Sequence, residues 1–318
     1  MVQKKILVVG GSGFIGQNLV RKLSKQKKYK INATYCKNKI NFRSKNVTWT
    51  KLDLKKKIKN ITVFKNIDTA IYCAANTSGF KDIINKPYLH VTDNSIMGSA
   101  FLRCCYDNGI KKVIFLSCTT MYQSSLEATS ETDYDPSKEL NKNYFGAAKT
   151  KLYLEDCCRF FSNLNKTKFV VIRHSNIYGP YDKFDLEKSH VFGATVCKVM
   201  NAKKSVTIWG RGNDRRDLLY VDDLVEFIEI LIKKFNNKFE IYNCGLGKFI
   251  RITNLVEKII KISNKKLKIK YDKTKPESNF NIRLSNKKAK KHFGWNPKTS
   301  INAGIKKTIQ FWSKHYGL

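Results

Sequence analysis

Long apolar runs are missing from this chain of 318 residues. Hydrophobic residues make up 42% of the sequence, enough for a sizeable core, yet no uninterrupted apolar stretch approaches the roughly 20 residues that span a bilayer. This excludes a helical membrane-spanning protein. The length is about twice that of a typical domain and shows no internal repeat or low-complexity linker, so we expect one large domain with a smaller partner, or two modest domains.

We also expect neither a cleavable leader nor paired cysteines. A short apolar run follows the basic first residues, but glycines interrupt it and no small-residue cleavage site comes after it. Nine cysteines, an odd number, lie mostly inside apolar segments, and none is spaced as Cys-x-x-Cys. The sequence therefore predicts a cytoplasmic protein with reduced, mostly buried thiols and no metal site.

Acidic residues are scarce. The chain has 25 Asp and Glu against 61 Lys and Arg, a formal charge of +36. Proteins that bind nucleic acid or anionic membranes concentrate such charge on one face. Here the lysines are spread over the whole chain and only ten of the basic residues are arginine, so we expect neither partner. The field still attracts anionic ligands such as nucleotides, although salt screens it within about 10 Å at 0.1 M.

Short β-rich runs alternate with amphipathic helical stretches through the first half of the chain. Alternation of this kind predicts an α/β fold, a Rossmann-like doubly wound parallel sheet. We expect helices over residues 17–27 and 95–108. The expected strands cover residues 6–9, 31–36, 47–52, 69–74, 113–117 and 169–174.

The rhythm changes after residue 176, where loops with glycine and charge separate the elements. Helices are expected from about residue 189, from 222, over 252–262 and over 301–312. We therefore predict a Rossmann domain of residues 1–175 plus about 216–243, and a smaller C-terminal α/β lobe of about 176–215 and 244–318.

A glycine-rich loop directly follows the first strand and opens a helix. Its spacing is Gly10-x-x-Gly13-Phe14-Ile15-Gly16. Glycine is needed where the backbone turns tightly, approaches a pyrophosphate and packs the helix on the strand. The amides at the start of the helix then face the phosphates. Followed by further β/α units, the loop predicts a dinucleotide site.

The end of the second strand lacks the carboxylate that usually binds the ribose of NAD. Tyr35 is followed by Lys37 and Lys39, and a lysine there favours the 2′-phosphate of NADP, so we expect NADP in preference to NAD. Four residues that follow the third and fourth strands are expected to contact the same cofactor: Asp53, Leu54, Ala74 and Ala75.

These motifs resemble the extended short-chain dehydrogenase/reductase family, the NAD-dependent epimerases and dehydratases of nucleotide sugars. The resemblance covers essentially the whole chain and includes residues 117–122, 173–180 and 293–297. Residues 179–191 and 209–223 are most similar to the GDP-L-fucose synthases, which epimerise C3 and C5 of a 4-keto-6-deoxy sugar and reduce C4 with NADPH. The resemblance implies a nucleotide-diphosphate sugar, GDP-linked, as substrate of the smaller lobe, and a homodimer formed partly by the segment after Lys149.

Two residues depart from the catalytic set that the resemblance implies. That set is a Ser or Thr four residues before a Tyr, together with Tyr-x-x-x-Lys. Lys149 is present, but Phe145 stands at the tyrosine and Cys118 at the hydroxyl. Phe145 could be an engineered change, or the proton donor could be Tyr144, Thr119 or Thr120. The chain could also be another nucleotide-sugar epimerase, reductase or dehydratase with a rearranged acid/base set. It could instead only epimerise, or bind NADP as a noncatalytic scaffold.

Epimerisation needs an acid and a base on opposite faces of the sugar. The resemblance implies that His190 is the acid and that the basic cysteine stands where this chain has Thr120, so that Cys118 is a candidate replacement. Guanidinium groups suit a diphosphate, and arginines cluster at positions 211, 215 and 216. The expected substrate-binding residues are Asn176, Ser189, His190, Lys198, Trp209, Arg216 and Arg283.

Overall fold

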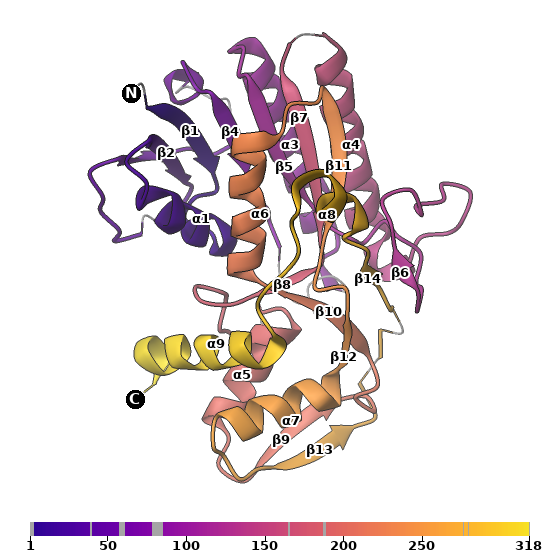
Figure 1. Ribbon diagram of the computed structural model, residues 1–318. Helices are drawn as coiled ribbons and strands as arrows, with labels where there is room; N and C mark the ends of the chain where they lie inside the picture. Colours follow the sequence, from indigo (N-terminus) through magenta and orange to yellow (C-terminus); the bar gives the residue numbers. More distant parts are fainter. Residues whose placement is uncertain are drawn as a thin grey trace.

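A seven-stranded sheet with helices on both faces stands above a smaller lobe in the computed structural model (Figure 1). The structure describes residues 3–38, 40–56, 61–77, 85–164, 166–186, 189–275, 277–278 and 280–317. Lys39, a candidate for the 2′-phosphate, lies outside the described residues. No helix among the described residues is long and apolar enough to cross a membrane.

All strands of the large sheet are parallel, in the order β3-β2-β1-β4-β5-β7-β11. This confirms the predicted Rossmann-like α/β class. Apolar residues fill the strands because helices cover both faces of the sheet. The strands are β1 (Lys4–Val9), β2 (Tyr29–Tyr35), β3 (Val47–Lys51), β4 (Thr69–Tyr72), β5 (Lys112–Ser117), β7 (Lys168–His174) and β11 (Phe239–Cys244).

Side-chain alternation along β1 assigns the two faces. Ile6 and Val8 pack with helices α1 (Phe14–Ser24) and α6 (Val221–Lys234), whereas Leu7 and Val9 pack on the opposite side. That opposite side is covered by α3 (Tyr88–Asp107) and α4 (Phe145–Leu164). Figure 1 shows α1 and α6 in front of the sheet and α3 and α4 behind it. Short 3₁₀ turns cover Ile61–Phe64 and Lys142–Tyr144.

The smaller lobe has its own core, formed between short strands and three helices. A three-stranded sheet in the order β12-β10-β8 and the pair β13-β9 form one side of it, and β14 pairs with β6 beside the lobe. The helices are α5 (Val191–Asn201), α7 (Ile252–Ile262) and α9 (Ile301–Tyr316), and α8 (Lys287–Phe293) packs near β11. The strands are β6 (Ala128–Thr129), β8 (Asn176–Tyr178), β9 (Ser205–Trp209), β10 (Arg215–Tyr220), β12 (Phe249–Arg251), β13 (Lys268–Asp272) and β14 (Arg283–Leu284).

The chain passes between the two sheets several times. β10 lies in the three-stranded sheet, and α6 and β11, which follow it, return to the large one. The proposed domain boundaries stay a prediction. Because the parallel strands all end toward the smaller lobe, the loops after β1, β2, β4 and β5 gather at the edge where α/β sheets bind ligands.

Candidate active site

The glycine loop has the geometry that a pyrophosphate requires. Gly10 has φ +78°, and a Cβ there would lie 2.7 Å from the backbone of Ala74. A Cβ at Gly16 would lie 2.2 Å from the carbonyl oxygen of Gly10. Helix α1 begins after Gly13 with no side-chain cap and no acidic residue in its first turn. The amides of Phe14 and Ile15 therefore start an open, positively polarised helix end, which fits a dinucleotide phosphate.

Two polar side chains that the sequence did not single out hold the neighbouring loops. The hydroxyl of Thr34, in β2, accepts the amide N–H of Gly10 at 3.0 Å. Asn94, buried in α3, accepts the Asn76 amide at 2.7 Å and donates to the Asn76 carbonyl at 3.0 Å. This second clamp fixes the loop after β4 that carries Ala74 and Ala75. Both contacts join positions about 20 residues apart, so no local motif reveals them.

The predicted site for the adenosine half of the cofactor lies at the C-terminal end of β2. Among the described residues there, none has a carboxylate side chain. Tyr35 is half-buried at the last position of the strand, and Lys37 is exposed. Asp53 is half-buried after β3, where it accepts the Lys55 amide at 3.1 Å. Leu54 is buried in the core. Of the nine cysteines, Cys36 alone is exposed.

Lys149 and Phe145 retain the spacing of the catalytic pair at the start of α4. Phe145 is the first residue of the helix and is 54% exposed. The Lys149 ammonium lies 5.9 Å from the centre of the Phe145 ring. It has no hydrogen bond or ion pair with the described residues. The site thus keeps the cation and the ring but has no phenol between them.

The loop after β5 brings the thiol of Cys118 to the hydroxyl of Thr120, with Sγ and Oγ1 3.0 Å apart. Thr119 accepts the Tyr122 amide through its carbonyl, which closes the turn. All three predicted residues of this loop are half-buried. Lys151, one turn along α4, donates to the Leu116 carbonyl at 3.0 Å, and burial lowers its pKa. The loop therefore places a thiol and a hydroxyl together beside the half-buried ammonium of Lys151.

His190 is the N-cap residue of α5 and caps no amide with its side chain. His190 is an exposed residue at this position. Desolvation lowers its pKa, and so do the charges of Lys183 and His90. His174 shares a hydrogen bond between Nδ1 and the Ser175 carbonyl at 2.8 Å, and burial lowers its pKa to about 4. Both rings are therefore neutral at pH 7.

Two lysines lie near the ring of Trp209 in the smaller lobe. The Trp209 ring is 42% exposed at the end of β9. Lys198 lies 5.7 Å and Lys275 5.8 Å from the ring centre. Lys198 also donates to the Thr207 carbonyl at 3.3 Å. An aromatic face between two ammonium groups is suited to a base stacked near phosphates.

Arg216 is held rigidly in the same lobe. Its guanidinium pairs with Asp214 at 3.3 Å and donates to the Ser278 hydroxyl at 2.8 Å. The Tyr144 ring packs against Phe280 in a tilted arrangement, with ring centres 5.4 Å apart. Burial raises the pKa of its phenol, and the charge of Arg216 partly opposes that rise. Tyr144 therefore points toward the smaller lobe, where it packs beside the predicted substrate residues.

The remaining candidates have partners within the protein. Arg283 donates to the Leu126 carbonyl at 3.0 Å and pairs with the exposed Glu127 at 3.5 Å. Asn176 donates to the Asp217 carbonyl at 3.3 Å. The Ser189 hydroxyl bonds the Lys183 carbonyl and accepts the Asp185 amide, so it stabilises the loop before α5.

One buried ionic network supports the loop from behind. Arg173 pairs with Glu155 at 2.7 Å, and both side chains are at most 5% exposed. Glu155 also accepts from the Ser117 hydroxyl, and Arg173 donates to the Tyr122 hydroxyl at 3.0 Å. The network therefore connects α4 to β5 and β7 just behind the candidate site.

A family model agrees with this architecture. The description "NAD dependent epimerase/dehydratase family" matches residues 6–245. The chain belongs to this family. Its members among the curated relatives include GDP-L-colitose synthase of Yersinia pseudotuberculosis, 30% identical over 96% of this chain and 97% of that protein. GDP-L-fucose synthase of Sinorhizobium fredii is 26% identical over 96% and 95%. The predicted family membership is thereby confirmed, in a group of nucleotide-sugar epimerases and reductases.

Solved structures share the fold at lower identity. UDP-glucose 4-epimerase of Thermotoga maritima has a TM-score of 0.84 at 24% identity, covering 98% of this chain and 99% of that one. UDP-glucuronic acid 4-epimerase of Bacillus cereus, in complex with UDP-glucuronic acid and NAD, has 0.83 at 23%, covering 98% and 100%. Enzymes of the family use nicotinamide cofactors.

Proposed function

We propose that the protein acts on a GDP-linked 4-keto-6-deoxy sugar, exchanging a proton beside the keto group and reducing C4 with NADPH. The observation that carries this is the pair formed by Lys149 and the Phe145 ring at the start of α4. The likeness to GDP-L-colitose and GDP-L-fucose synthases over nearly the whole chain supports the sugar class.

The residues present fit a dinucleotide, because the glycine loop is as open as a pyrophosphate needs and α1 presents uncapped amides. Gly10, Gly13 and the first turn of α1 would hold the phosphates, and Lys149 the nicotinamide ribose. Lys37 favours NADPH over NADH at the adenosine end. When bound, the cofactor supplies hydride to C4.

His190 and Cys118 are the proposed proton-transfer pair, in roles opposite to those that the resemblance implies, because a lowered pKa keeps the His190 ring neutral. The neutral ring of His190 is suited to remove the acidic proton from the carbon beside the keto group, and the electron pair of that C–H bond moves toward the keto oxygen. Lys149 stabilises the developing oxyanion by its charge. The thiol of Cys118, hydrogen-bonded to Thr120, then returns a proton to the carbon from the other face. The substrate diphosphate would lie against Arg216 and Arg283, with the base at Trp209.

Phe145 makes reduction the weaker half of this activity. A ring without a hydroxyl gives no proton to the C4 oxygen, so that proton must come from Thr119, Thr120, Lys149 or water. General acid catalysis by a positioned group contributes about 10²–10⁴-fold. A second candidate function, epimerisation alone, is favoured by this same residue.

The test uses the purified chain and Phe145→Tyr with NADPH and GDP-4-keto-6-deoxymannose in deuterated water. We expect deuterium uptake into the sugar in both proteins, measured by mass spectrometry. NADPH oxidation, followed by absorbance, is expected to be slow in the parent and about 10²-fold faster with the restored phenol. Phe145→Leu is the matched control and should not gain oxidation.

Each outcome separates the candidates. Deuterium uptake with no oxidation in any variant would identify an enzyme that only epimerises. Tight NADPH binding with neither signal in any protein would contradict this sugar and favour another nucleotide sugar or a noncatalytic role.

A homodimer is part of the proposal. The outer face of the α3 and α4 pair exposes four large apolar side chains, each about half exposed, and the Ser99 hydroxyl bonds the Tyr153 hydroxyl between the two helices. Apolar stripes of this kind mark interfaces. The four residues are Ile96, Tyr153, Phe160 and Leu164.

A further inference from the structure

The loop after β8, residues 179–186, leads to His190 and contacts both lobes. In this loop Lys183 donates through Nζ to the carbonyl of Thr77, in the loop after β4, at 2.5 Å. Desolvation and the charge of this ammonium lower the pKa of His190, which is the N-cap of α5. The position of the loop therefore decides where both side chains stand.

Ser189 ties this loop to the start of α5. Its hydroxyl donates to the Lys183 carbonyl and accepts the Asp185 amide, the latter at 2.8 Å. These bonds close the loop on itself immediately before His190. A displacement of the first half of the loop is therefore passed to His190 through Ser189.

Tyr181 has a strained backbone near the start of the loop. Its φ is +67°, in the left-handed region that residues with a Cβ rarely adopt. Such a residue persists only where its surroundings hold it, and strained residues cluster at functional sites. The Pro180 carbonyl before it accepts from the side chain of Asn18 in α1 at 2.8 Å. The Tyr181 ring packs against Phe311 of α9 with ring centres 4.6 Å apart. Contacts from both lobes thus hold this segment.

Arg21, in the last turn of α1, makes a further contact with Tyr181. Its guanidinium carbon lies 4.6 Å from the centre of the Tyr181 ring and 4.4 Å from the centre of the Phe42 ring. The Nε atom is buried and has no hydrogen-bond partner among the described residues. Cation–π attraction to the two rings therefore holds this side chain, and desolvation strengthens such attraction.

Phe42 belongs to the connection between β2 and β3, which follows the candidate adenosine-end residue Lys37. The Phe42 carbonyl accepts the indole N–H of Trp49 at 2.9 Å, and this bond fixes the connection on β3. Arg21 thus joins two segments that are far apart in the sequence. One follows the adenosine end of the cofactor site, and the other leads to His190.

We propose that Arg21 is a positioning residue for proton transfer. Through Tyr181 it holds residues 179–186 against α1, and this sets the position of Lys183 and His190 relative to the cofactor site. Arg21 lies at the end of α1 that is farther from the glycine loop. Its loss should therefore slow the reaction without weakening the binding of either ligand. The inference rests on the proposed function of His190.

Amide hydrogen exchange of the full chain with NADP⁺, read by mass spectrometry, measures how firmly the loop is held. In Arg21→Met we expect the amides of residues 179–186 to exchange about tenfold faster than in the parent, because two ring contacts are lost. Arg21→Lys keeps a cation near the rings and should change exchange by about threefold or less. Tyr181→Asn removes the ring but tolerates the same backbone, so it should loosen the loop even if Arg21→Met fails to fold.

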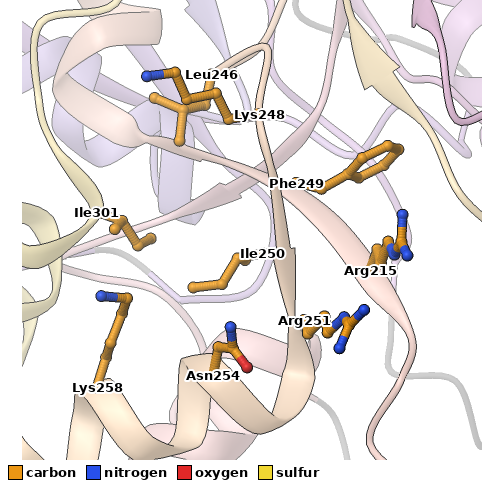
Figure 2. A pocket seen from close by; sticks show the side chains of 9 residues that line it. All are labelled: Arg215, Leu246, Lys248, Phe249, Ile250, Arg251, Asn254, Lys258 and Ile301. Carbon is orange, nitrogen blue, oxygen red and sulfur yellow. The ribbon is translucent and has the colours of Figure 1, made fainter.

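Two controls separate the stacked arginine from general effects. Arg159→Met removes a guanidinium that lies 5.1 Å from the centre of the Phe239 ring, a similar contact between α4 and β11. Arg251→Met removes the same charge from the cavity beside β12, where Figure 2 shows its side chain on the same side of the strand as Arg215. Both controls should leave the exchange of residues 179–186 as it is in the parent.

Deuterium uptake into the sugar measures the consequence for the reaction. Arg21→Met should lower the kcat of uptake about tenfold, because the loop that carries Lys183 is held less firmly. The KM for the nucleotide sugar and the Kd for NADPH should each change by about twofold or less. Arg21→Lys should recover most of the rate. A loss of folded protein alone would not be rescued by keeping the charge.

Three results would overturn the proposal. Unchanged amide exchange in both Arg21→Met and Tyr181→Asn would show that the rings do not hold the loop. Faster exchange with an unchanged kcat would show that proton transfer does not depend on the position of the loop. Equal effects in Arg159→Met or Arg251→Met would leave only stability or charge. A parent that takes up no deuterium would instead contradict the proposed function, while amide exchange still decides whether Arg21 holds the loop.

Discussion

At the scale of single residues, the pKa of His190 is lowered by desolvation and by two nearby basic side chains. Lys183 and His90 both lower its pKa, in addition to desolvation. A base with a lowered pKa stays deprotonated to lower pH, so we expect the rate of deuterium exchange to remain constant well below pH 6.5. Lys183→Met should shift the acidic limb of that profile toward higher pH. His190→Asn should remove exchange almost completely, and an unchanged limb in Lys183→Met would contradict the assignment.

Asp182 is a buried carboxyl whose Oδ2 atom has no hydrogen-bond partner among the described residues. Burial raises its pKa to about 7, from 3.8 in the unfolded chain. Between these values the folded state holds a proton that the unfolded state releases, so this group lowers stability as pH rises from about 4 to 7. In Asp182→Asn this loss should be absent, an effect of about 1–3 kcal/mol at pH 8 relative to pH 5. Urea unfolding of both proteins across this range measures it, and parallel curves would exclude it.

At the scale of elements, the sequence predicted the six strands and four of the six expected helix starts, and it placed the starts of α1 and α3 too late. The six expected strands match to within two residues, and all except the partly exposed edge strand β3 are largely buried in a sheet covered on both faces. Helix α3 begins at Tyr88, seven residues before the expected start, because its first turns carry polar residues such as His90 and Asn94 that face inward. Helix prediction from hydrophobic periodicity detects only apolar faces, so it misses a helical turn whose buried face is polar.

Only those residues of the candidate site that belong to local sequence motifs could be predicted. The glycine loop and Lys149 are defined by spacing within a few residues, which reads directly from the chain. Thr34, Asn94 and Lys183 act through contacts made between distant elements, and nothing in their own neighbourhood distinguishes them.

Helix α4 carries the candidate Lys149, and its position depends on Glu155. This carboxylate pairs with Arg173 of β7 and accepts from Ser117 of β5. Glu155→Gln would leave a buried guanidinium without its counter-charge, so we expect a loss of about 3–5 kcal/mol in unfolding free energy. The double variant with Arg173→Met should recover part of this loss. Denaturant unfolding of the four proteins of this cycle gives the coupling, and additive losses would contradict it.

At the scale of the whole molecule, the α3 and α4 face predicts the assembly. The unaltered chain should sediment at twice the 36.8 kDa of one chain, and Phe160→Glu should sediment as a single chain because a charge replaces an apolar contact. Leu126→Glu is the control, since Leu126 is equally exposed but lies away from these helices. A parent that sediments as one chain at all concentrations would exclude the dimer.

The distribution of thiols leaves a single exposed cysteine to which a reporter dye can be coupled. Eight of the nine cysteines are half-buried or buried, whereas Cys36 is exposed at the tail of β2. A maleimide dye would therefore react there first. The label would stand one residue from Lys37, at the adenosine end of the cofactor cleft, so its fluorescence would respond when that end is filled. Occupancy could then be followed without any turnover, which separates binding from chemistry in a protein that has Phe145 where the resemblance implies a tyrosine.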